Sequence, residues 1–142
     1  MAVEFNGYEI EPGANLRRAD LAGATLVGVN LAGAYLVGAN LSHVRLSYAF
    51  LGGALLEGAN LRRANLIHAK LKRANLLRVD LLGADLRWAN LKRAGLEGAN
   101  LSGADLVGAK LRWTNLTGAI YDRKTVWPPG FDPKAAGVIF ED

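Results

Sequence analysis

The chain has 142 residues, no cysteine, and 17 Lys and Arg against 13 Asp and Glu, which gives a formal net charge of +4. This length fits one domain, and the lack of cysteine excludes a disulfide framework and thiolate metal ligands. No run reaches the roughly eighteen apolar residues of a membrane helix. The N-terminus MAVEFNGYEI lacks the features of a signal peptide. We therefore expect a cytoplasmic protein without a membrane span.

The first predicted element is a β-hairpin cap within residues 1–13. Val3-Glu4-Phe5 and Tyr8-Glu9-Ile10 flank Asn6-Gly7, which is a strong signal for a two-residue hairpin turn. In this register Phe5 lies opposite Tyr8 and Val3 opposite Ile10, so one face of the hairpin is apolar. We expect that face to cover the start of the next segment, with Pro12-Gly13 as the joint.

Residues 14–118 repeat with a period of five. A leucine occurs at every fifth position from Leu16 to Leu116, twenty-one times without a break, and Ala, Val or Thr stands two residues before each one. This Ala-x-Leu triplet alternates in, out, in, as a short extended segment does. Asn or Asp often lies between the two inward residues, and we expect its side chain to bond to backbone groups of the adjacent corner.

The two residues after each leucine must turn a corner so that the next alanine points inward again. Gly occupies the second corner position in 11 of the 21 repeats. Arg, His, Tyr or Trp fills the others, so we expect no strict requirement for a positive φ at this position. Short extended segments joined by corners wind into a coil, with about 4.8 Å between successive turns.

The tandem A-(D/N)-L-x-x pattern resembles the pentapeptide repeat family over 105 of the 142 residues. Members of that family are all-β solenoids, right-handed quadrilateral β-helices, so the resemblance implies four pentapeptides per coil and about five coils here. A recurrence at twenty residues agrees, because Leu81-x-Gly83-Ala84-Asp85-Leu86 returns as Leu101-x-Gly103-Ala104-Asp105-Leu106. The segments flanking the repeats resemble those of short cyanobacterial members. An interior filled by leucine and alanine leaves no room for a ligand, which places the function on the outside.

Residues 119–142 are expected to form a C-terminal cap. The register ends after Ala119-Ile120-Tyr121, and Trp127-Pro128-Pro129-Gly130-Phe131 is incompatible with regular structure. Asp132 as an N-cap and Pro133 at the first helical position predict a short helix through about Phe140. The apolar side chains of this segment are expected to cover the last coil. The alternative is a homodimer interface, because some family members are reported to pair end to end.

The outer walls of a coil with twenty residues per turn differ in charge. Residues 14–118 contain 14 Lys and Arg against 6 Asp and Glu. Half of those positive charges fall on one wall that carries no acid, the wall centred on Leu31, Leu51, Leu71, Leu91 and Leu111. We call this set the basic wall: Lys70, Lys72, Arg73, Lys92, Arg93, Lys110, Arg112 and, at its far corner, Trp113. At the preceding corner, three residues spaced by twenty are expected to form an aromatic ladder: Tyr48, His68 and Trp88.

No arrangement typical of a catalytic, cofactor or metal site is found in the sequence. His43 and His68 fall on different faces of adjacent coils, too far apart to share a metal without other ligands. Asp85 and Asp105 stack on an open wall, where no cleft excludes water or shifts a pKa. No glycine-rich loop precedes a helix, so there is no phosphate cradle of the usual kind. We therefore expect a protein that is not an enzyme.

The expected function is a non-catalytic interaction module that binds an acidic protein partner through its outer walls. The family resemblance supplies one alternative, because some members resemble DNA and modulate DNA gyrase. That mechanism requires an acidic exterior, whereas residues 14–118 are basic, and it is less favoured. A second alternative is direct binding of nucleic acid or another anionic surface, for which aromatic residues among cations are suited. The remaining interpretation is that the basic wall binds no partner and only keeps the solenoid soluble.

Overall fold

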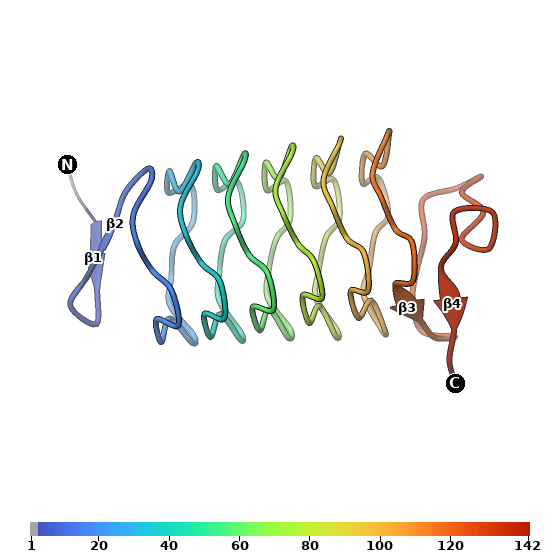
Figure 1. Ribbon diagram of the computed structural model, residues 1–142, viewed down its shortest axis with the longest axis horizontal. Helices are drawn as coiled ribbons and strands as arrows, with labels where there is room; N and C mark the ends of the chain where they lie inside the picture. Colours follow the sequence, from blue (N-terminus) through green and yellow to red (C-terminus); the bar gives the residue numbers. More distant parts are fainter. Residues whose placement is uncertain (1–2) are drawn as a thin grey trace.

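The computed structural model describes residues 3–142, and most of that chain is a coil that stacks on itself along one axis (Figure 1). Parallel bridges join residues that are twenty positions apart, from Asn15 with Tyr35 to Asn100 with Ile120. Between coils, the amide of Leu51 donates to the carbonyl of Lys70 at 2.7 Å, and the amide of Lys70 donates to the carbonyl of Ala49 at 2.9 Å. This spacing is the one that the sequence predicts, and it fixes which side chains are neighbours on each wall.

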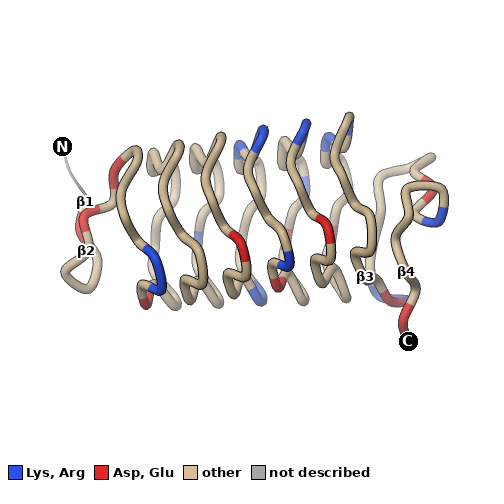
Figure 2. Tube along the Cα trace, in the orientation of Figure 1, with Lys and Arg blue, Asp and Glu red and all other residues tan. Residues whose placement is uncertain are grey.

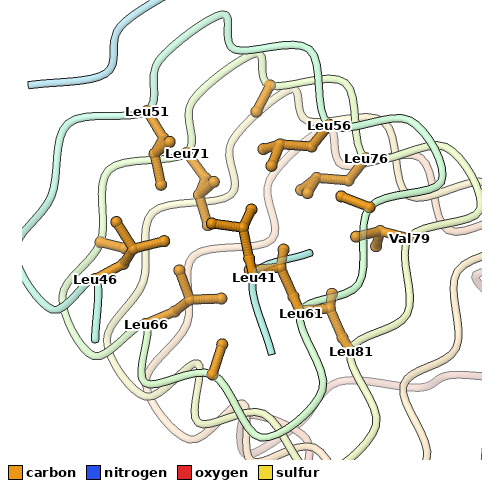
Figure 3. Packing of buried hydrophobic residues seen from close by; sticks show 14 of the residues in the cluster. Leu41, Leu46, Leu51, Leu56, Leu61, Leu66, Leu71, Leu76, Val79 and Leu81 are labelled. Carbon is orange, nitrogen blue, oxygen red and sulfur yellow. The ribbon is translucent and has the colours of Figure 1, made fainter. Parts of the chain in front are cut away.

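The repeat leucines and alanines fill the interior of the coil. Every repeat leucine except Leu111 has at most 2% of its surface exposed, and residues 3–142 bury no polar or charged residue. Figure 3 shows the leucines of successive coils, among them Leu46, Leu66 and Leu71, pointing from the walls toward the axis. Each buried leucine contributes roughly 1.5–3 kcal/mol of gross apolar stabilisation. The interior is therefore a stack of side chains that leaves function to the outer surface.

Every corner of the coil contains a left-handed residue, which corrects the expectation that no positive φ is required there. The second corner residue has φ between +54° and +72° in all twenty-one repeats, whether or not it is glycine. In each corner the next amide donates back to the leucine carbonyl, as Ala74 does to Leu71 at 3.0 Å. This combination is that of a type II turn. Every corner must turn in the same sense for the coil to continue. Arg, His, Tyr and Trp at this position therefore adopt the left-handed conformation as well.

Asn and Asp side chains brace these corners, as predicted. At all thirteen positions where Asn or Asp stands between the two inward residues, its Oδ1 accepts a hydrogen bond from the amide two residues later. The bond from the Arg62 amide to Asn60 measures 3.0 Å. A bond of this kind contributes about 0.5–1.5 kcal/mol net. The Asn and Asp residues are thus structural rather than reactive.

The N-terminal hairpin forms in the predicted register. Strands β1 (Val3–Phe5) and β2 (Tyr8–Ile10) pair antiparallel, with Val3 opposite Ile10 and Phe5 opposite Tyr8. Asn6 and Gly7 have φ of 50° and 79°, as a type I′ turn requires. Ile10 is 4% exposed and Phe5 and Tyr8 pack against the core, whereas Val3 is 41% exposed. Three of the four apolar side chains therefore cover the first coil.

The C-terminal segment adds two short strands instead of the expected helix. Strands β3 (Ile120–Tyr121) and β4 (Ile139–Phe140) pair in parallel. As predicted, the repeat register ends after Tyr121, since Asp105 pairs with Val126 at a spacing of twenty-one. Within residues 3–142 no helix is long and apolar enough to cross a lipid bilayer.

The helix expected through about Phe140 does not form, and residues 133–137 make only a turn. Asp132 acts as the predicted cap, because its Oδ1 accepts a hydrogen bond from the Ala135 amide at 3.3 Å. However, Gly137 has φ of 81°, and the Val138 amide donates to the Pro133 carbonyl at 2.9 Å. These features form a Schellman motif, which ends a helix. Gly137 therefore returns the chain to an extended path, and Ile139 pairs with Ile120 instead of continuing a helix.

Candidate functional site

Backbone pairing arranges the cations of the basic wall in columns. Phe50 pairs with Lys70, Lys70 with Asn90, and Asn90 with Lys110, so these four residues form one column. The same register stacks Lys72 on Lys92 and then Arg112, and it stacks Arg73 on Arg93 and then Trp113. All seven cations are exposed except Lys92, which is half-buried. Figure 2 shows positive residues recurring along the upper edge of the later coils.

The positive charge of this wall is not neutralised by carboxylates. The ion pairs within residues 3–142 join Arg62 to Asp80, Arg87 to Asp85 and Asp105, and Arg123 to Asp142. None of these pairs involves a residue of the basic wall. Like charges stacked on adjacent coils repel each other, so an anionic group that contacts this wall relieves a repulsion built into the fold.

Aromatic rings hold three of the cations of the wall. The Lys70 ammonium lies 4.2 Å from the centre of the Phe50 ring. At the far corner, the guanidinium groups of Arg93 and Arg112 lie 4.5 and 4.2 Å from the centre of the Trp113 ring. Trp113 thus orients two arginines of the wall. Such cation–π contacts at exposed sites contribute about 0.5–1 kcal/mol each.

The structure brings the three rings of the aromatic ladder together at the preceding corner. The ring centres of Tyr48 and His68 are 4.9 Å apart with an interplanar angle of 14°, and those of His68 and Trp88 are 6.3 Å apart with an angle of 15°. The Trp88 ring lies over the next coil, in the space that a side chain at Gly108 would occupy. The ladder is therefore a ridge of stacked rings along the edge of the basic wall.

A shallow groove of about 440 Å³ runs between the ladder and the lysine columns. The three ladder rings line one side of this groove, and Lys70, Lys72, Lys110 and Asn90 complete its lining. Ammonium groups and an amide beside an apolar ridge suit a ligand that carries carboxylate or phosphate groups and some apolar surface.

Comparison with known proteins identifies the repeat. The sequence profile of pentapeptide repeats matches residues 14–47, 39–76 and 80–118, with 8 copies. The chain belongs to the pentapeptide repeat family. The fold is accordingly the right-handed β-helix for which that family is known, and family members are in general structural or interaction proteins rather than enzymes. No curated protein sequence gives a significant match.

Several solved structures of pentapeptide repeat proteins are similar to this chain. HetL, involved in heterocyst differentiation regulation in the cyanobacterium Nostoc sp. strain PCC 7120, is 25% identical with a TM-score of 0.56; the match covers 90% of this chain and 79% of HetL. A protein from the Arabidopsis thaliana thylakoid lumen is 31% identical with a TM-score of 0.55, covering 80% of this chain and 72% of that one. Another protein, from Nostoc PCC 7120, is 37% identical with a TM-score of 0.43, covering 79% of this chain and 84% of that one.

Exposed apolar side chains of this pentapeptide repeat protein gather on the same wall. Four of the six large hydrophobic residues exposed within residues 14–118 lie on the basic wall or its two corners: Tyr48, Phe50, Trp88 and Trp113. Of these four, only Phe50 is not predicted from the sequence. The signal was present for Phe50, which stands twenty residues before Lys70 at a repeat position that Asn or Asp often fills.

Three of the six carboxylates on the other walls, Asp80, Asp85 and Asp105, pair with arginine. Arg87 lies 2.7 Å from Asp85 and 3.9 Å from Asp105, so the two stacked carboxylates share one guanidinium group. The hydrogen bond from Arg87 lowers the pKa of Asp85, although partial burial opposes this effect. A carboxylate with a lowered pKa is a poor general acid or base near neutral pH. Within residues 3–142 no three His, Asp or Glu residues lie close enough to hold a metal ion.

Proposed function

We propose that this pentapeptide repeat protein is a non-catalytic interaction module whose basic wall binds a partner protein with an acidic surface. The main support is the charge pattern: seven of the fourteen cations of residues 14–118 lie on one wall that carries no acid, whereas the other walls carry both signs. An acidic partner relieves the repulsion within the columns and is steered toward the wall by long-range attraction.

Two features favour a protein over the alternative partners. The ladder rings stack on one another, and the Trp113 ring already carries two guanidinium groups, so few ring faces remain free for the bases of a nucleic acid. A DNA-mimic role toward DNA gyrase requires an acidic exterior, and the repeats of this chain have 14 basic against 6 acidic residues.

Binding of fluorescein-labelled poly-L-glutamate, followed by fluorescence anisotropy, tests the basic wall. The wall variant changes Lys72, Arg73, Lys92 and Arg93 to Glu. The control changes Arg18, Arg45, Arg63 and Arg78 to Glu, which alters the net charge equally on other walls. We expect the wall variant to lose at least about tenfold in affinity and the control to lose several-fold less. Equal losses would mean that only net charge matters and would overturn the proposal.

A labelled single-stranded oligonucleotide provides the second arm of this experiment. If the oligonucleotide binds more tightly than poly-L-glutamate, and the wall variant loses that binding, the partner is a nucleic acid and not an acidic protein. The slope of affinity against salt concentration reports how many cations contact the phosphates.

We also propose that the C-terminal cap supports end-to-end homodimers. The cap exposes Ile139 by 50%, Phe140 by 47% and Val126 by 44%, an apolar exposure that a second copy would bury. Sedimentation equilibrium of the protein and of Ile139→Lys tests this, with Val27→Lys as a control at an equally exposed position on a wall. A dimer that only Ile139→Lys dissociates supports the proposal, and a monomeric wild-type protein at high concentration refutes it.

A further inference from the structure

We infer that the partner segment is bipartite, with an apolar anchor on the N-terminal half of the wall and an acidic stretch on the C-terminal half. This inference rests on the proposed function and adds the chemistry and orientation of the bound segment. The ligand that fits this wall is an extended acidic peptide with one aromatic or large aliphatic residue at one end.

The two halves of this wall differ sharply in chemistry. All seven cations of the basic wall lie between Lys70 and Arg112, and the same positions in the two preceding coils carry only uncharged residues: Asn30, Ala32, Gly33, Phe50, Gly52 and Gly53. Figure 2 shows the change, since the upper edge carries positive residues only in the later coils. A partner of uniform charge would satisfy only one half.

The uncharged half exposes an apolar platform. Tyr48 is 52% exposed and Phe50 44%, and both stand in the coil before Lys70. The surface beside them is open, because a Cβ placed at Gly28, one coil before Tyr48, would meet no atom within 4 Å. Backbone and aromatic surface are therefore accessible to an incoming side chain, as at the centre of an interface hot spot.

Lys70 marks the junction between the two halves. Its ammonium lies over the Phe50 ring on one side, and its side chain lines the groove beside Lys72 and Lys110 on the other. A carboxylate that binds in the groove attracts this ammonium away from Phe50. The Phe50 ring then becomes more accessible, which couples occupation of the acidic half to occupation of the apolar half.

The dimensions fit a short extended peptide. Four steps of about 4.8 Å separate the coil of Asn30 from the coil of Trp113, a distance of about 19 Å along the axis. An extended chain rises about 3.3 Å per residue, so about six residues cover both halves. The anchor lies toward the N-terminal cap of the solenoid, and the acidic residues lie toward the C-terminal cap.

Two synthetic peptides test the inference by fluorescence anisotropy. One is Phe-Gly-Glu-Glu-Glu-Glu, labelled at the acidic end, and the other has Ala in place of Phe. We expect the Phe peptide to bind about tenfold more tightly, because burying a phenylalanine on the platform adds apolar contact. That advantage should persist at high salt, which screens only the charged contacts.

A matched pair of variants places the anchor. Phe50→Asn gives the residue that the same column has at Asn30 and Asn90, so the corner can keep its regular geometry. Tyr35→Asn makes the equivalent change on another wall, in the column of Asn15 and Asn75. We expect Phe50→Asn to abolish the advantage of the Phe peptide and Tyr35→Asn to leave it unchanged.

The outcomes distinguish this inference from the proposed function. If both peptides bind equally, the bipartite surface is refuted while the basic wall stands, and if neither peptide nor poly-L-glutamate binds, the proposed function itself fails. A nitroxide at the acidic end of the bound peptide should broaden the amide resonances of Arg112 and Trp113 more than that of Val27. The reverse pattern would refute the orientation.

Discussion

The carboxylate of Asp122 accepts, at 2.9 Å, the hydrogen bond that the amide of Gly103 would give to a backbone carbonyl in a regular coil. One coil earlier the equivalent amide, that of Gly83, donates to the Ser102 carbonyl at 2.9 Å. The extra residue that offsets Asp105 against Val126 removes such a carbonyl. The Asp122 side chain therefore maintains the pairing between the last regular coil and the cap.

Replacing Asp122 by Ala is expected to lower the free energy of unfolding by about 1–3 kcal/mol, because the Gly103 amide is left without its partner. Asp122→Asn keeps an oxygen acceptor and should cost clearly less. Urea denaturation followed by circular dichroism at pH 7 measures both. Equal losses for the two variants would show that the charge of Asp122, and not its role as an acceptor, matters.

The pH dependence of stability gives an independent test of the same residue. Partial burial raises the pKa of Asp122, but hydrogen bonds from Gly103, Lys124 and Thr125 outweigh it and lower the pKa. The resulting stabilisation is present above the ordinary pKa of about 3.9 and is lost as the pH falls through the lower folded value. Asp122→Asn should therefore show a smaller loss of stability between pH 6 and pH 2 than the wild-type protein.

Two adjacent glycines in one corner separate backbone strain from side-chain contact. Gly53 has φ of +66°, and a Cβ there would meet no atom within 4 Å, whereas Gly52 has no positive φ and its Cβ would lie 3.6 Å from the Lys72 carbonyl oxygen. Gly53→Ala should cost about 1 kcal/mol through backbone strain alone. Gly52→Ala should be neutral or stabilise by up to about 1 kcal/mol. Thermal denaturation measures the stability of both variants. If Gly52→Ala were less stable than Gly53→Ala, the type II turn at this corner would be contradicted.

The sequence predicts the features that depend on periodicity. The recurrence at twenty residues identifies which side chains stack, so the columns containing Lys70 and the order of Tyr48, His68 and Trp88 follow from it. The hairpin register follows from Asn6-Gly7, because a two-residue turn leaves one pairing of the flanking strands. These are consequences of backbone geometry, which repeats along the chain.

Features that depend on a single residue or on side-chain geometry were missed. Ten of the left-handed corners contain Arg, His, Tyr or Trp, which hide the conformational requirement because inter-coil pairing overrides their backbone preference. Gly137 prevents the predicted helix, because its left-handed φ turns the chain away directly after the N-terminal signal of Asp132 and Pro133. The contact of Lys70 with Phe50 required coordinates, since a flexible lysine reaches several neighbours.

Arg87 is expected to control the titration of Asp85. The hydrogen bond from Arg87 is the main cause of the lowered pKa of Asp85, so removing it should raise that pKa toward its ordinary value. In Arg87→Gln, the carboxyl ¹³C resonance of Asp85 should titrate at a higher pH than in the wild-type protein. Stability that depends on the Asp85 carboxylate is lost as the pH falls through the lowered pKa, so this variant should lose less stability in acid. An unchanged Asp85 titration would show that the guanidinium group has no such role.

Gly108 is expected to be required for the position of Trp88 at the end of the ladder. The Trp88 ring occupies the space above Gly108, so in Gly108→Ala the new methyl group must displace the indole. Gly58→Ala is the matched control, because Gly58 is also left-handed, with φ of +65°, but has no atom near its Cβ position. Both variants carry the same backbone strain, and only Gly108→Ala should also disturb the stacking of Trp88 on His68.

The two variants can be compared by ¹⁹F NMR of protein labelled with 5-fluorotryptophan, which gives one resonance for each of the three tryptophans. We expect Gly108→Ala to shift the Trp88 resonance and to lower stability by about 1 kcal/mol more than Gly58→Ala, since stacked ring contacts are lost. The Trp113 and Trp127 resonances serve as internal references. A Trp88 resonance that stays in place would show that the ring does not rest on Gly108, and the C-terminal side of the groove would then lack its apolar wall.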